Sequence, residues 1–293
     1  FQAEDGIRDV ERSRGLGDVY KRQDDRRTYS GWVRAWECDT TEHFTVAYYY
    51  QRFSQATHRL LLEMGWDYKE QRFPASTDCY TRFLQELNQG DSFEIRSGVI
   101  ESDSQSMKLG HKLINSETGE LCTTMEQVLN EGPRINMKSF EIDWDGEPRE
   151  DRGELPAGAK EFCSAMDVVR PEEVDWSGQL DLSGYIHRFS AANQNIQTRF
   201  GMSRSYADQN RIGFSTFEFQ LSFPGTHLRS GEAQQVFSSI AHVGRTSMRT
   251  VHRMERNGGE TVALLSIMGV HFCLLYTSPS PRDLSTSRMP SSA

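Results

Sequence analysis

Residues 39–65 read DTTEHFTVAYYYQRFSQATHRLLLEMG, and residues 175–201 read DWSGQLDLSGYIHRFSAANQNIQTRFG. The two stretches align without a gap at an offset of 136, and they share a leading aspartate, a Tyr-x-x-Arg-Phe-Ser segment and a closing glycine. Further downstream, matching pairs recur in the same order with small changes in spacing, as expected when the loops of two copies differ in length. The repeat predicts two copies of one unit of about 110 residues.

Both ends of the chain resemble translated sequencing adapter rather than protein. Codons that encode residues 18–23 have a reverse complement that, shifted by one base, encodes residues 273–278. Scars of this kind are excluded from fold reasoning. We therefore assign residues 1–23 and 273–293 to adapter and interpret the remainder as a metagenomic fragment, whose natural termini we expect to lie outside this sequence.

Composition excludes several classes of function. The chain holds 33 Lys and Arg against 42 Asp and Glu, and the acidic excess argues against a nucleic-acid binder, which normally carries a basic surface. No apolar run approaches the roughly 20 residues of a membrane span. The cysteines outside the adapter have neither close pairs nor metal-ligand spacing, so we expect no metal site and a reduced, cytoplasmic setting. These cysteines are Cys38, Cys79, Cys122 and Cys163.

Each unit is predicted to contain a strand, a long helix and an antiparallel meander. The helix shows an apolar stripe at spacings of four and three and stops at a glycine. The stripe comprises Tyr49, Phe53, Ala56, Leu60 and Met64, followed by Gly65. In the first copy we expect strands at residues 31–38, 79–84, 93–101, 106–114 and 121–129.

A segment rich in Pro, Gly and acids separates the copies. It reads as a linker or a long surface crossing, with a solvated loop as the simplest interpretation. The expected boundaries are 24–130 for the first unit, 131–160 for the linker and 161–272 for the second unit. Because an isolated antiparallel sheet would expose an edge strand, the two copies are expected to share one continuous sheet.

This pattern resembles the hot-dog superfamily, specifically its tandem acyl-CoA thioesterases and relatives of 4-hydroxybenzoyl-CoA and acyl-carrier-protein thioesterases. The shared motif is an aspartate, a short loop to a histidine, a tyrosine and a helix that ends in glycine, matched here by Asp39, His43, Tyr49, Ala56 and Gly65. The sequence departs from the family at Thr41, Thr45 and Val46, where asparagines are common, and at Glu42, a position usually Gly or Gln. The resemblance implies an α+β fold in which each sheet wraps a central helix and the two units form one pseudo-dimeric sheet.

A thioester hydrolase needs a base or nucleophile on one side of the carbonyl and hydrogen-bond donors on the other. An aspartate between a strand and a helix start can meet both needs, so Asp39 is the candidate base or nucleophile, with backbone amides near residues 42–46 polarising the carbonyl. Helix capping is the competing interpretation of Asp39. His43 can position the thioester, assist proton transfer or satisfy a buried backbone group, and Glu42 is either a second base or an exposed loop residue.

Several further residues are candidates for substrate binding. Thr41 and Thr45 supply hydroxyl donors or cap the helix, and Tyr49 lines an acyl pocket or packs in the core. In the second copy Asp175 keeps the acid but Gln179 replaces the histidine, so structural support is the favoured role there, with Gln179 able to donate to an acyl or pantetheine carbonyl. Arg249 can contact the phosphates of coenzyme A or lie on a solvated strand face.

The sequence thus predicts an acyl-CoA hydrolase of lipid metabolism that needs no cofactor beyond the coenzyme A of its substrate. Its expected partner is a small-molecule acyl thioester, without nucleic acid or membrane, and the tandem unit can further assemble into a homo-oligomer. A hot-dog hydratase or dehydratase is the second enzyme class, and an acyl-CoA-binding or interaction module with a degenerate site is the non-enzymatic alternative.

Overall fold

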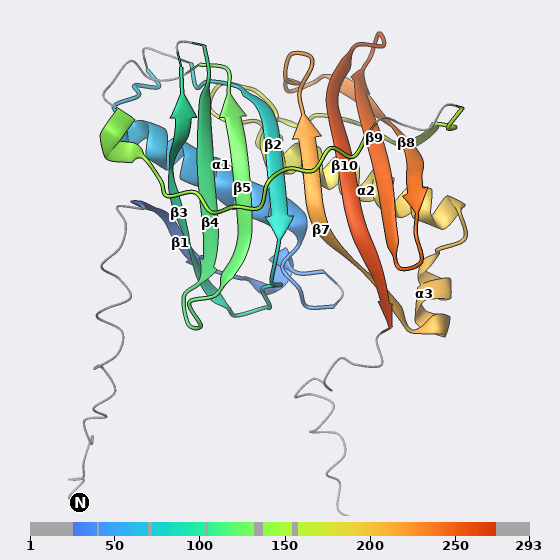
Figure 1. The fold of residues 1–293 in the computed structure, drawn as a ribbon. Coiled ribbons are helices and arrows are strands. Elements are labelled where there is room, and N and C mark those ends of the chain that lie inside the picture. The colour runs from blue at the N-terminus through green and yellow to red at the C-terminus, as the bar shows by residue number, and fades with distance from the viewer. Residues whose placement is uncertain are drawn as a thin grey trace, which may run out of the picture.

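The computed structural model describes residues 26–273, with gaps at residues 40, 70–71, 104, 132–136 and 154–157. The segments assigned to adapter lie outside this part, apart from the backbone of Cys273. The described residues form one ten-stranded antiparallel sheet, and two long helices cover one of its faces (Figure 1). Within these residues, no helix is long and apolar enough to cross a membrane.

The first unit is a five-stranded sheet crossed by one helix. Its strands lie in the order β1-β3-β4-β5-β2. The elements are β1 (Arg26–Trp32), α1 (Val46–Glu63), β2 (Ser76–Phe83), β3 (Ser92–Ser102), β4 (Met107–Asn115) and β5 (Leu121–Leu129).

The second unit repeats this plan, as the repeat in the sequence predicts. Its strands run β7-β10-β9-β8-β6, which is the order of the first unit in reverse. The elements are β6 (Phe162–Val168), α2 (Leu182–Arg199), β7 (Ile212–Ser222), β8 (Ala233–Val243), β9 (Ser247–Arg256) and β10 (Thr261–Cys273). A short helix, α3 (Arg204–Asn210), follows α2 and is an addition to the second unit.

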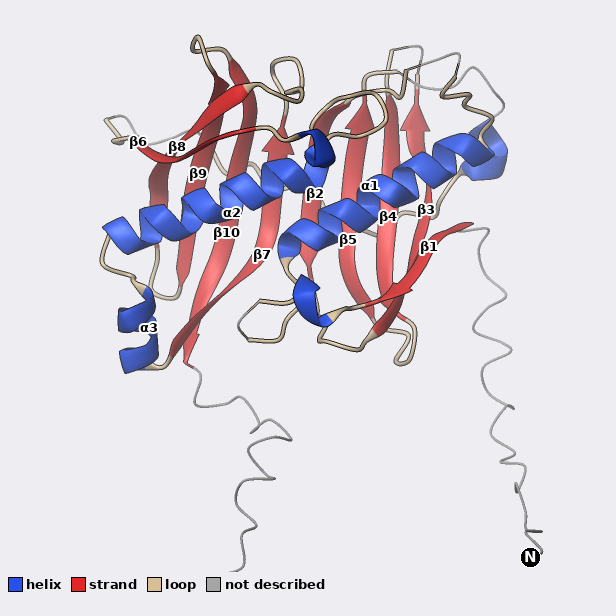
Figure 2. Ribbon diagram, turned by 180° about the vertical axis from the view of Figure 1, so that it is seen from behind, coloured by secondary structure: helices blue, strands red, loops and turns tan. Residues whose placement is uncertain are grey.

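The two units join through an antiparallel pairing of β2 with β7. Cys79 lies opposite Leu221 and Thr81 opposite Phe219. This pairing satisfies the backbone groups that would otherwise form an exposed edge in the middle of the molecule. Figure 2 shows α1 and α2 side by side on the same face of the shared sheet. The prediction of one continuous sheet shared by the two units is confirmed.

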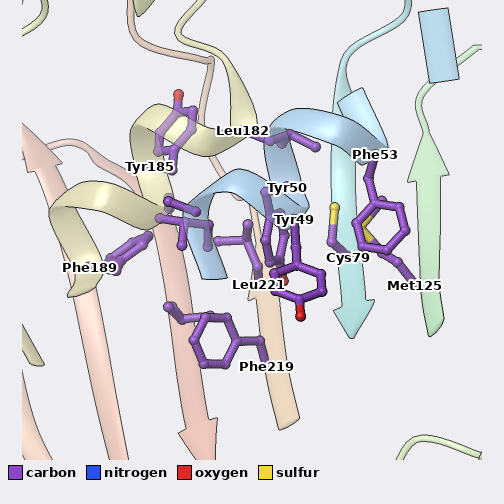
Figure 3. Packing of buried hydrophobic residues seen from close by; sticks show 14 of the residues in the cluster. Tyr49, Tyr50, Phe53, Cys79, Met125, Leu182, Tyr185, Phe189, Phe219 and Leu221 are labelled. Atoms are coloured by element: carbon purple, nitrogen blue, oxygen red, sulfur yellow. The ribbon is translucent and has the colours of Figure 1, made fainter. Parts of the chain in front are cut away.

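Both long helices pack their apolar stripe onto the sheet. All five predicted stripe residues of α1 are buried, and Gly65 ends the helix with a φ of +88° that favours glycine. The equivalent Gly201, with a φ of +89°, follows α2. Figure 3 shows aromatic side chains of both helices, Tyr50 and Phe189 among them, converging over the central strands into one core.

The strand predicted for residues 31–38 is wrong in its extent. β1 ends at Trp32, and a 3-10 helix spans Ala35–Glu37. The turn is stabilised by the side chain of Glu37, whose Oε2 accepts the amide of Arg34 at 3.1 Å. Aromatic residues favour strands, but this local capping interaction outweighs that preference.

The linker lies against the outer face of the sheet, opposite the helices (Figure 1). Trp144 covers Gly110 so closely that a Cβ there would lie 2.4 Å from the indole ring. Arg152 of the linker donates two hydrogen bonds, of 2.8 and 2.7 Å, to Glu218, whose side chain is 1% exposed. The described part of the linker is therefore a surface crossing that packs on both units rather than a solvated loop.

Candidate active site

The Asp39 loop connects the 3-10 helix of the first unit to α1 and is closed by its own aspartate. Oδ1 of Asp39 accepts the backbone amide and the hydroxyl of Thr41, at 2.8 and 2.6 Å, and the amide of His43 at 3.2 Å. All three bonds fall on Oδ1, so Oδ2 is the oxygen that can face water or a thioester carbon. The carboxylate is solvent-exposed, which leaves it open to a substrate.

His43 connects this aspartate to a residue that the sequence did not single out. Its Nδ1 lies 3.1 Å from the hydroxyl of Thr41 and 3.3 Å from Oε2 of Glu86, in the loop between β2 and β3. The His43 side chain is 33% exposed. Asp39, Thr41, His43 and Glu86 thus form a continuous polar chain at the start of α1, with the other ring nitrogen of His43 available to a ligand.

Most backbone amides of the loop are already engaged. The amides of Glu42, Phe44 and Thr45 donate to the carbonyls of Asp39, Leu87 and Glu37. The amides of the first helical turn have no carbonyl four residues before them within the helix, so they lack an intrahelical acceptor. The donors expected over residues 42–46 therefore narrow to Val46 and its successor Ala47, at the N-terminus of α1.

Two candidate substrate-binding residues near the start of α1, Thr45 and Tyr49, occupy positions that support the structure. Thr45 is the N-cap residue of α1, without a capping hydrogen bond from its side chain. The hydroxyl of Tyr49 accepts the amide of Leu87 at 3.2 Å, and burial raises the pKa of this phenol. Tyr49 therefore holds the loop that carries Glu86, and its ring packs in the core rather than lining an open pocket.

Glu42 adopts a backbone conformation that side chains rarely occupy. Its φ is +65°, in the left-handed region that costs an ordinary residue about 1 kcal/mol or more. The equivalent position of the second unit is Gly178, with a φ of +76°. Gly178 makes this turn without a Cβ to strain it, whereas Glu42 makes it with a side chain.

The Asp175 loop of the second unit forms the same set of hydrogen bonds as the Asp39 loop of the first unit. Oδ1 of Asp175 accepts the amide and hydroxyl of Ser177 at 2.8 and 2.7 Å and the amide of Gln179 at 3.1 Å. In both loops the aspartate is thus a structural acceptor whether or not a histidine follows.

Equivalent ion pairs, each made by a buried arginine, brace the two loops against their helices. Arg52 of α1 pairs with Glu37, which is 2% exposed, and Arg188 of α2 pairs with Glu173 at 3.0 Å. Burial alone would raise the pKa of Glu173, but hydrogen bonds from Arg188 and from a backbone amide lower it below its usual value. Each loop is therefore tied to the first turns of its helix.

Comparison with known proteins gives this architecture a name. Residues 33–130 match the profile of the Thioesterase-like superfamily. Betainyl-CoA thioesterase of Pseudomonas aeruginosa is 27% identical over 104 residues, which make up 33% of this chain and 65% of that protein. An acyl-ACP thioesterase from Bacteroides thetaiotaomicron superposes with a TM-score of 0.62 at 10% identity, over 82% of this chain and 96% of its own. A protein from Alicyclobacillus acidocaldarius described as having a hot dog fold gives 0.51 at 12% identity, over 87% and 95%. The chain has a double hot-dog fold.

A cavity of about 40 Å³ lies where the two hot-dog units meet, and it adjoins the second loop rather than the first. Asp175 and Gln179 line one side, and α1 contributes His58 from the other side. The polar chain around His43 and this cavity therefore belong to different loops of the double hot-dog.

Arg249 has a position that does not suit the predicted contact with coenzyme A. It lies on the outer face of the sheet, where its guanidinium donates to the carbonyls of Arg152 and Gly153 in the linker and to the hydroxyl of Ser266. Burial lowers the pKa of this arginine. Its role is to anchor the linker, away from both aspartate loops.

No cluster of three or more His, Cys, Asp or Glu side chains in the described ranges is arranged to hold a metal ion. Glu86 and His227 are the site residues that sequence reasoning missed. Both directly precede a leucine, Leu87 or Leu228, whose amide donates to the hydroxyl of a helix tyrosine. An alignment of the two copies that extends to the loops after β2 and β7 places Glu86 and His227 at equivalent positions, and this is the signal that could have found them.

Proposed function

We propose that the chain hydrolyses an acyl-CoA or acyl-carrier thioester at the Asp39 loop. The observation that carries this proposal is the polar chain from Asp39 through Thr41 and His43 to Glu86 at the N-terminus of a helix. It joins a carboxylate, an imidazole and helix amides, the three kinds of group that acyl transfer from a thiol requires.

In the proposed reaction, His43 orients a water molecule, and Asp39 accepts its proton while the water oxygen bonds to the thioester carbon. The developing negative charge on the carbonyl oxygen is stabilised by the amides of Val46 and Ala47 and by the dipole of α1. The carbon–sulfur bond then breaks, the thiolate takes up the proton held by Asp39, and the carboxylic acid product releases its own proton to solvent. Glu86 keeps the imidazole oriented through its contact with Nδ1.

The test is release of free thiol from a panel of acyl-CoA substrates, which should include betainyl-CoA, the substrate named for the Pseudomonas aeruginosa relative. Asp39→Asn keeps an oxygen that can accept the loop hydrogen bonds but removes the charge. We expect kcat/KM to fall by about 100-fold or more. Asp67→Asn is the matched control, because Asp67 also closes a tight turn, accepting the amide of Lys69 at 2.8 Å, at the far end of α1. Unchanged activity in Asp39→Asn would exclude Asp39 as the base or nucleophile.

A non-catalytic acyl-CoA-binding module is the second candidate function. It is favoured by the identical aspartate turn in the Asp175 loop, which forms without a histidine. Protection of the protein against thermal unfolding by acyl-CoA, without thiol release from any member of the panel, would identify this function instead.

A further inference from the structure

The cavity at the Asp175 loop has polar groups on every side. Asp175, Gln179 and Asp181 come from the second unit, and the middle of α1 faces them with Ser54 and His58. A second histidine, from the loop between β7 and β8, completes the lining: His227. The cavity thus collects titratable groups that hydrolysis at Asp39 does not use.

The two units carry a histidine at different, non-equivalent positions around their aspartate loops. In the first unit His43 lies in the aspartate loop and Glu86 in the loop after β2. In the second unit Gln179 occupies the first place, and His227 occupies the place of Glu86, immediately before Leu228. The second unit therefore carries its imidazole in the loop after β7, and this imidazole lines the same cavity as Gln179.

The hydrogen bond of His227 fixes which of its nitrogens can act as a base. Nε2 lies 2.7 Å from the carbonyl oxygen of Ser76, which can only accept, so Nε2 carries the proton and Nδ1 keeps its lone pair. Phe223 stacks on the ring with centroids 4.4 Å apart, and Tyr185 meets it edge-on. Burial lowers the pKa of His227 below its usual value, although the hydrogen bond to Ser76 and the charge of Asp175 act in the opposite sense, and this favours the neutral ring.

The size and floor of the cavity limit what it can accept. A volume of about 40 Å³ admits only a few small groups. The floor is held rigid by hydrogen bonds of 2.6 Å from Thr57 to Gln127 and from Gln127 to Ser76. A long alkyl chain would have to displace this satisfied network, which would leave buried polar groups unpaired.

We propose that the cavity beside Asp175 is a second thioester-hydrolysing site, limited to acyl groups of two or three carbons, in which His227 supplies the base. The proposal rests on the thioester hydrolysis proposed for the Asp39 loop, whose aspartate turn it shares. Nδ1 of His227 takes a proton from water, and the water oxygen bonds to the carbonyl carbon. The carbon–sulfur bond breaks, the thiolate receives that proton from His227, and the carboxylic acid product releases its own proton to solvent.

The experiment uses the full chain with its first loop disabled by Asp39→Asn and His43→Asn. Thiol release is measured from propionyl-CoA and octanoyl-CoA. We expect octanoyl-CoA activity to fall by about 100-fold, as expected when general acid–base groups are removed, and propionyl-CoA activity to persist. Adding His227→Gln should then lower the remaining propionyl-CoA activity by at least about 10-fold, while adding His242→Gln, at an exposed position of β8 outside the cavity, should not.

The outcomes separate the two proposals. A wild-type chain that releases no thiol from any acyl-CoA refutes hydrolysis altogether. An active wild-type chain whose first-loop variant is inert on propionyl-CoA refutes the second site alone. Residual activity that disappears with His242→Gln, or that survives His227→Gln, refutes the assignment of the base. Melting temperatures of all variants identify any loss of activity that is caused by unfolding. If His227→Gln unfolds the protein, the pH profile of propionyl-CoA hydrolysis by the first-loop variant decides the assignment instead. A rate that stays flat to below pH 6.5 supports a buried neutral histidine as the base, and a rate that falls above that pH refutes it.

Discussion

Two buried histidines should make this protein sensitive to mild acid. His111 is fully buried under α1, with Nδ1 2.7 Å from the hydroxyl of Ser97, and burial lowers its pKa to about 4. His252 has the same place under α2, 2.6 Å from Ser238, with a pKa lowered to about 3. A folded-state pKa below the unfolded value of about 6.5 means that the unfolded chain binds the proton first. The stability is therefore fully present above pH 6.5 and is lost as the pH falls toward 4.

The expected magnitude follows from these values. Between pH 7 and pH 5 each histidine should lower the free energy of unfolding by about 2 kcal/mol, so the pair accounts for about 4 kcal/mol. His111→Asn and His252→Asn remove the titrating group and retain an amide that can hydrogen bond. Urea unfolding at both pH values gives the difference for each variant, independently of any constant cost of the substitution. Each single variant should lose about 2 kcal/mol less than wild type on acidification. An equal loss in wild type and the double variant would show that these histidines do not control acid stability.

The remaining predictions concern the supports of the two loops. Arg52→Leu should lower the free energy of unfolding by about 3–5 kcal/mol, because it leaves a carboxylate that is 2% exposed without its cation. Arg188→Leu should cost less, because the side chains of its two carboxylate partners, Glu173 and Asp167, are 17% and 48% exposed; equal losses in urea unfolding would contradict this. Glu42→Gly should stabilise the chain by about 0.5–1 kcal/mol by relieving the left-handed strain. A melting temperature that does not rise would show that interactions of the Glu42 side chain compensate for the strain.

The sequence predicts the fold well because the repeat and the helix stripe are strong signals. A stripe at spacings of four and three positions Tyr49, Phe53 and Leu60 on one face of the helix, and duplication predicts a shared sheet without knowledge of any contact. The strand predicted for residues 31–38 failed where a single side chain, that of Glu37, caps a turn. Propensity describes average environments, and one local hydrogen bond suffices to change the outcome over three residues.

The candidate site is less accessible to sequence reasoning because its residues come from separate loops. The Asp39 motif is local, and the structure does bring Asp39, Thr41 and His43 together. Glu86 lies 43 positions after His43 and is brought to it by contacts that a local pattern does not show, among them the bonds of Leu87 with Tyr49 and Phe44. Arg249 illustrates the opposite case: an alternating strand pattern shows that it faces outward, but not that the linker will cover it.

The position of the two loops explains how their chemistry can diverge within one chain. The cavity beside Asp175 takes one wall from its own unit and the other from α1, so a substitution on α1 alters the second site without entering the Asp39 loop. In a symmetric pair of identical subunits the same change would alter both sites at once. Duplication within one chain removes that constraint, since His43 and Gln179 are encoded separately although they occupy equivalent positions. The difference between Glu86 and His227 is one that a pair of identical subunits could not hold, and it predicts that the two loops differ in the acyl groups they accept.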